Sequence, residues 1–81
     1  MLQTKPKAMP EPKYTYIISD PNESTTGAAT TLKKAIAMVE KITHDDVEVD
    51  DKYFLWEGET NIFRYELDNG WYIDKITMNQ I

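Results

Sequence analysis

Aromatic and β-branched residues gather in three runs along the C-terminal part of the chain. These runs are Tyr53 to Trp56, Ile62 to Leu67 and Trp71 to Met78, and residues of these types are enriched in β-strands. Glycine-containing segments at 57–60 and 68–70 separate the runs and are typical of tight turns. The pattern therefore predicts a meander of three strands.

The turn at 68–70 decides how the last two strands align. A two-residue loop of Asn69 and Gly70 would put Asp74 in the middle of an apolar face. A three-residue loop, with Gly70 in the left-handed conformation, instead sets Arg64 opposite Asp74. A one-residue slip moves every side chain to the other face. We favour the three-residue loop because it leaves one face apolar and pairs opposite charges on the other.

This alignment predicts which side chains the sheet buries. With Trp56 opposite Asn61, the core face beneath the helix carries Phe54, Trp56, Phe63, Tyr65, Leu67, Trp71 and Ile73. The reverse face carries Tyr53, Leu55, Ile62, Arg64, Glu66, Tyr72, Asp74 and Ile76. A two-layer domain with one helix has nothing left to cover the reverse face, which makes it a candidate binding surface.

The first half of the chain predicts one strand and one helix. Tyr14 to Ile18 is a β-branched and aromatic run that ends at a turn signal around Pro21. Residues 20–30 lack large apolar groups, which predicts a loop. From Thr31 onward, apolar residues recur at steps of three and four, as on one face of a helix: Leu32, Ala35, Ile36, Val39 and Ile42. Thr30 or Thr31 is the expected amino-terminal cap, with Ser24 as the alternative.

These elements predict an α+β fold, a two-layer βαβββ arrangement with one helix on a mostly antiparallel four-stranded sheet. Residues 1–13 contain Pro6, Pro10 and Pro12 and few large apolar residues. We expect them to form a disordered, basic, proline-rich arm. Residues 14–81 are then expected to form a single α+β domain, since the chain of 81 residues supports one small core.

Charge is distributed unevenly along the chain. Residues 1–13 have a net charge of +2 and residues 14–44 are neutral, whereas from residue 45 ten acids face only Lys52, Arg64 and Lys75, for −7. Direct binding of nucleic acid by the folded part is therefore not expected, and a partner protein with a basic surface is the better electrostatic match. The absence of cysteine permits a reducing compartment. With no apolar run near the roughly 20 residues of a membrane span, we expect a cytoplasmic protein without membrane contact.

Few residues suggest chemistry. Asp46, Glu48 and Asp50 alternate as in a calcium loop, but Asp51 stands where the sharp turn of such a loop requires glycine. His44 is the only histidine, and at a helix end it is more often a capping residue than a general base. A pocket of about 300 Å³ is not expected in so small a domain. We therefore expect no catalytic residues, no metal, no cofactor and no enzymatic activity.

The remaining hypothesis is a surface that binds another protein. In size and charge the chain resembles small acidic proteins of phages and mobile elements that disable host or defence proteins, including anti-restriction and anti-CRISPR inhibitors. The resemblance implies an inhibitor or adaptor of a basic, nucleic-acid-handling protein, with acids that imitate phosphates. The expected partner-binding residues are Asp45, Asp46, Glu48, Asp50, Asp51, Tyr53, Leu55, Glu57, Glu59, Ile62 and Tyr72. The alternative is a homo-oligomeric structural or assembly protein, with a homodimer formed through the open sheet face.

Overall fold

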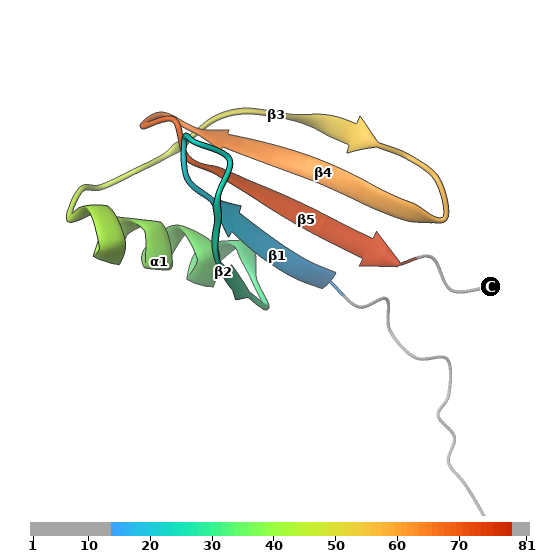
Figure 1. The fold of residues 1–81 in the computed structure, drawn as a ribbon, viewed down its shortest axis with the longest axis horizontal. Helices are drawn as coiled ribbons and strands as arrows, with labels where there is room; N and C mark the ends of the chain where they lie inside the picture. The colour runs from blue at the N-terminus through green and yellow to red at the C-terminus, as the bar shows by residue number, and fades with distance from the viewer. Residues whose placement is uncertain (1–13, 79–81) are drawn as a thin grey trace, which may run out of the picture.

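One helix lies against one face of an antiparallel sheet of five strands (Figure 1). The computed structural model describes residues 14–78, so the predicted arm at 1–13 lies outside the described residues. In chain order the elements are β1 (Tyr14–Ser19), β2 (Thr25–Ala29), α1 (Leu32–Thr43), β3 (Val49–Trp56), β4 (Thr60–Leu67) and β5 (Tyr72–Met78). The strands lie in the order β2-β1-β5-β4-β3, which leaves β2 and β3 at the two edges.

The meander and the register of its last two strands are confirmed. Arg64 pairs with Asp74 across β4 and β5, and Gly70 has a φ of 93° in a three-residue loop. The loop is closed by the Leu67 amide, which donates to the Trp71 carbonyl at 2.8 Å. This register fixes which face of the sheet each side chain of the last two strands occupies.

A fifth strand forms where the sequence predicted a loop. Thr25–Ala29 pairs antiparallel with β1, and Tyr16 lies opposite Ala29. The turn between the two strands is held by Asp20, whose Oδ1 accepts from the amides of Asn22 and Ser24, both at 2.9 Å. Its small side chains gave this strand no apolar pattern, but backbone pairing with β1 and contact with α1 hold it at the edge of the sheet. The predicted four-stranded sheet is therefore corrected to five strands.

The helix begins where its cap predicts. Thr31 accepts a hydrogen bond from the Lys34 amide at 3.1 Å, which satisfies one of the free N–H groups of the first turn. His44 ends the helix in the left-handed conformation, with a φ of 61°, and its amide donates to the Glu40 carbonyl at 2.7 Å.

The core lies beneath the helix at one side of the sheet. α1 packs against β1, β2 and β5, and Figure 1 shows β3 and the outer part of β4 extending beyond it. The buried apolar residues are Ile18, Ala35, Val39, Val47, Leu67 and Ile73. Val47 was not expected in the core; it lies in the acidic connector, where its amide donates to Glu40 Oε2 at 3.1 Å.

Three residues predicted to be in the core are instead exposed. Phe54 is 55% exposed because the helix does not reach β3. Trp56 is 62% exposed. Ile42 is 47% exposed near the end of the helical stripe. A helix is about 10 Å wide, whereas five strands spaced about 4.8 Å apart are nearly twice as wide, so one helix covers only part of this sheet.

Candidate functional site

Exposed apolar side chains are concentrated on the edge strand β3. Within residues 15–77, the large apolar side chains that are exposed are Ile42 and five residues of β3, here called the β3 patch: Val49, Tyr53, Phe54, Leu55 and Trp56. Scattered exposed apolar residues are normal on a protein surface, but a concentration of them often marks an interaction site. The five lie along one strand, with Tyr53 and Trp56 on the face away from the helix and Phe54 on the helix side. The β3 patch is therefore the leading candidate surface.

Two bulges shape this strand. The pairing with β4 shifts between Val49 and Asp51 and again between Phe54 and Trp56. Phe54 lies opposite Phe63 as predicted, whereas Trp56 lies opposite Ile62 and not opposite Asn61. The extra residue at the second bulge turns Trp56 toward the face away from the helix, which corrects its predicted place on the core face.

Acidic residues flank the β3 patch at both ends. Asp45, Asp46 and Glu48 lie in the connector before β3, Asp50 and Asp51 lie at its start, and Glu57 and Glu59 lie in the turn after it. All seven are exposed. The structure therefore brings nine of the eleven predicted partner-binding residues, including Tyr53 and Leu55, onto β3 and its flanks.

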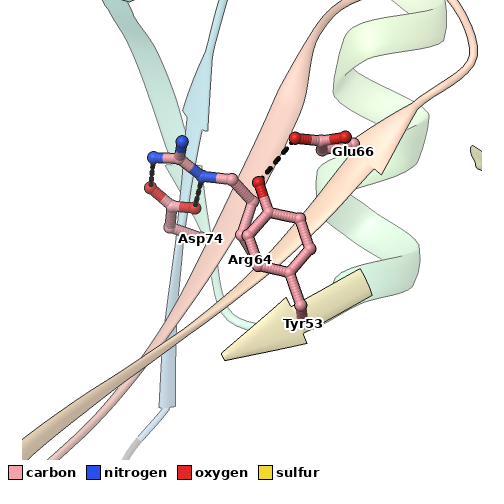
Figure 2. Close-up of polar contacts among 4 residues, drawn as sticks. All are labelled: Tyr53, Arg64, Glu66 and Asp74. Carbon is pink, nitrogen blue, oxygen red and sulfur yellow. Dashed lines mark hydrogen bonds and ion pairs between the residues drawn. The ribbon is translucent and has the colours of Figure 1, made fainter. Parts of the chain in front are cut away.

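The other two predicted residues, Ile62 and Tyr72, are half-buried on the face away from the helix. Figure 2 shows that polar contacts occupy this face. Arg64 donates two hydrogen bonds to Asp74, from Nε to Oδ1 at 2.7 Å and from Nη2 to Oδ2 at 2.9 Å. The Arg64 guanidinium also stacks over the Tyr72 ring, with 4.0 Å between Cζ and the ring centroid. Tyr72 is thus less available to a partner than the sequence suggested.

Tyr53 links the β3 patch to this polar face. Its hydroxyl donates to Glu66 Oε2 at 2.6 Å, as Figure 2 shows. The hydrogen bond to Glu66 is the main reason that the pKa of Tyr53 is raised, because it stabilises the protonated phenol. The hydrogen bond to Asp74 likewise raises the pKa of Arg64. Tyr53 therefore stays a neutral donor, and the Arg64 side chain a cation, at physiological pH.

A groove lies on the helix side of the sheet, where the helix does not reach. It has a volume of about 320 Å³ and is lined by Phe54, Asn61, Phe63, Tyr65, Lys75 and Thr77. The rings of Phe54 and Phe63 meet edge to face with centroids 4.9 Å apart, and those of Phe63 and Tyr65 with centroids 5.1 Å apart. The prediction that so small a chain has no pocket of about 300 Å³ was wrong, because it assumed that the helix covers the whole face.

The arrangement does not point to a metal site or to a histidine-based centre. Among residues 14–78 no group of three or more His, Asp or Glu side chains is placed to hold a metal ion. His44 is exposed at the helix end, where its backbone caps the last turn. No helix in this part of the chain is long and apolar enough to cross a membrane.

Comparison of the chain with protein-family models, with curated proteins and with solved structures gave no match. The function is therefore argued from the chemistry of the β3 patch, its acidic flanks and the adjoining groove.

Proposed function

We propose that this protein is a non-enzymatic binding module that acts as an inhibitor or adaptor of a basic partner protein, and that it binds this partner through the β3 patch. The observation that carries the proposal is the exposure of five large apolar side chains on one edge strand, between two groups of acids. Apolar and aromatic side chains at the centre of an interface supply most of its affinity. The acidic rim supplies attraction and orientation.

The charge of the rim defines the partner class. Residues 45–81 have a net charge of −7, and the seven acids beside β3 are all exposed. Such a surface attracts a positive one, and proteins that handle nucleic acid carry positive surfaces. The acids then occupy positions at which the partner would otherwise hold phosphates, so a nucleic-acid-handling protein of a host or of a defence system is the proposed target.

Affinity capture from the native host, with the full-length chain as bait, tests the proposal. We expect the captured complex to weaken steeply with salt and nucleic acid to compete for the partner. Glu57→Gln combined with Glu59→Gln is expected to weaken binding at least tenfold, and Leu55→Asp to abolish it. Glu23→Gln is the matched control, since this exposed acid lies in the β1–β2 turn, at the β2 side of the sheet.

Two outcomes would count against the proposal in different ways. If the complex is insensitive to both salt and competing nucleic acid but is lost with Leu55→Asp, the β3 patch remains the binding site and the proposed phosphate mimicry is contradicted. Equal binding by wild type, the paired Gln variant and Leu55→Asp would remove the site altogether.

Self-association is the second candidate, favoured by one observation: β3 is a long edge strand with no strand on its outer side among residues 14–78. Exposed edges of this kind pair readily with another copy. Light scattering over a concentration series separates the candidates, because a tight dimer at micromolar concentration that is lost with Leu55→Asp would favour the homo-oligomer.

A further inference from the structure

We infer that residues 9–12 of this chain, with the sequence Met-Pro-Glu-Pro, dock into the groove on the helix side of the sheet. Met9 covers the rings of Phe54 and Phe63, and Glu11 lies among the lysines beside the groove. These four residues lie outside the part of the chain that the structure describes. The inference goes beyond the proposed function and does not depend on it, because the contact is made within one molecule.

The groove combines an aromatic floor with positive charge. Phe54, Phe63 and Tyr65 form a row of rings in which neighbours meet edge to face. Lys75 forms part of the opposite wall, on β5. Lys52 lies on the same face of the sheet, since it stands opposite Tyr65 on β3. The groove therefore suits a segment that carries both an apolar side chain and a carboxylate.

Residues 9–12 have the matching chemistry. Glu11 is the only acid among residues 1–13. The thioether of methionine packs favourably against aromatic rings, and proline-rich segments bind aromatic-lined grooves because their extended conformation is restricted before they bind. The sequence predicts disorder for residues 1–13 because they have too few apolar side chains to form a core. A preformed groove supplies the apolar surface that they lack.

The start of β1 brings this segment within reach of the groove. Tyr14 pairs with Thr77 of β5, which lines the groove. β1 and β3 are separated by β5 and β4, so at about 4.8 Å per strand they lie roughly 14 Å apart. From Tyr14 back to Met9 the chain advances about 3.1 Å per residue in an extended, proline-rich conformation, roughly 15 Å in total. Met9 therefore reaches Phe54 on β3, and Glu11 lies over the strands between, near Lys75.

Attachment to β1 favours this occupant over a separate molecule. A segment joined to its site by a short linker has an effective concentration in the millimolar range. A dissociation constant of about 1 mM for the unattached segment is then sufficient to fill the groove about half of the time. A segment of a second copy, or of a partner, must bind without this advantage.

Docking covers one member of the β3 patch and leaves others accessible. Phe54 is 55% exposed on the helix side, and covering its ring removes apolar surface from water, which favours binding. Tyr53 and Trp56 lie on the other face of the sheet. They therefore stay available to a partner while the segment is docked.

Nuclear magnetic resonance of the full-length protein tests the contact directly. With ¹³C on the methionine methyl groups, we expect nuclear Overhauser effects between the Met9 methyl and the ring protons of Phe54 and Phe63. Met9→Ser should weaken docking about tenfold, as expected for an apolar side chain that returns to water. Glu11→Gln should weaken it about twofold, because an exposed ion pair contributes little. The ¹⁵N amide signals of Phe63 and Thr77 report the docked fraction.

Two further variants serve as controls. Leu2→Ser removes an apolar side chain from the same arm, outside residues 9–12, and we expect the amide signals of the groove to keep their wild-type positions. Phe54→Ala removes a ring from the groove, and the Overhauser effects between Met9 and Phe63 should weaken about tenfold. Because Phe54 is more than half exposed, this change leaves the fold intact, and unchanged amide signals of the buried residues Ile18 and Val39 verify this.

Several outcomes would overturn the inference. One is the absence of Overhauser effects between Met9 and the groove, and another is an equal change of the groove signals with Leu2→Ser and Met9→Ser. Overhauser effects found only between differently labelled copies in a mixed sample would assign the groove to the arm of a second copy. Signals of Phe63 and Thr77 that respond to a captured partner but not to Met9→Ser would assign it to that partner. None of these results decides whether the β3 patch binds a basic protein, which the capture experiment tests separately.

Discussion

Removing the ion pair between β4 and β5 tests how far the face away from the helix contributes to stability. Arg64 and Asp74 are joined by two hydrogen bonds of 2.7 and 2.9 Å, and their side chains are 22% and 15% exposed. The perturbation is a double-mutant cycle of Arg64→Ala, Asp74→Ala and the combined variant. The cycle isolates the energy of the pair from the separate losses of each side chain.

The exposure of the two side chains determines how much stability their ion pair should contribute. Fully exposed pairs contribute about 0.2–1 kcal/mol, whereas removal of one partner from a buried pair costs about 3–5 kcal/mol. This pair lies between those limits, so we expect Asp74→Ala to cost about 2–3 kcal/mol and the coupling energy to be about 1–2 kcal/mol. Arg64→Ala should cost more than the coupling energy because it also removes the stacking on Tyr72, worth about 0.5–1 kcal/mol.

Urea unfolding monitored by circular dichroism measures these free energies. A shift in the transition midpoint at constant slope reports a change in stability alone. A coupling energy below about 0.3 kcal/mol would refute the reasoning, because the pair would then behave as an exposed one. Additive losses from both single variants would mean that neither side chain depends on the other.

Two further predictions concern local geometry. His44→Gly should stabilise the fold by about 0.5–1 kcal/mol, seen as a rise of about 4 °C in Tm, because glycine adopts the left-handed φ of 61° without strain. His44→Ala is the control, and an equal rise in Tm with alanine would contradict this explanation. As the pH rises above about 10, the Tyr53→Phe variant should lose less stability than the wild type. The pKa of Tyr53 is raised in the folded protein, so its contribution to stability is complete below the usual pKa of tyrosine and is lost as the phenol ionises. Denaturation curves of both proteins at pH 8 and pH 11 test this, and equal losses of stability would contradict it.

The turn chemistry of the sequence predicted the register of the meander. Only a three-residue loop ending at Gly70 placed Arg64 opposite Asp74, and the structure has this pairing. Charge complementarity across two strands is a local constraint, and it can be evaluated from a short stretch of sequence. The helix and its Thr31 cap were predictable for the same reason.

The other features depend on geometry that residue types do not express. β2 consists of Thr, Gly and Ala, which have no apolar alternation, and its place in the sheet depends on backbone pairing with β1. The bulge that turns Trp56 away is a change in pairing and leaves no mark in composition. Val47 stands among acids with no apolar periodicity around it, and only its packing in the core cluster buries it.

The candidate site was predicted in part. The acids and Tyr53 and Leu55 were identified from the sequence, and the structure places them on β3 and in the segments directly before and after it. The groove and Phe54 were missed because every apolar residue on the helix side of the sheet was assigned to the core. Comparing the width of one helix with that of the sheet would have indicated that part of this face stays open.

The separation between the buried core and β3 has a consequence for how the sequence can change. None of the core residues belongs to β3, and all eight residues of this strand are exposed. Substitutions there and substitutions in the core should have additive effects on stability where the residues share no contacts. The strand can therefore acquire a new pattern of side chains, by selection or by design, while the rest of the molecule keeps its fold.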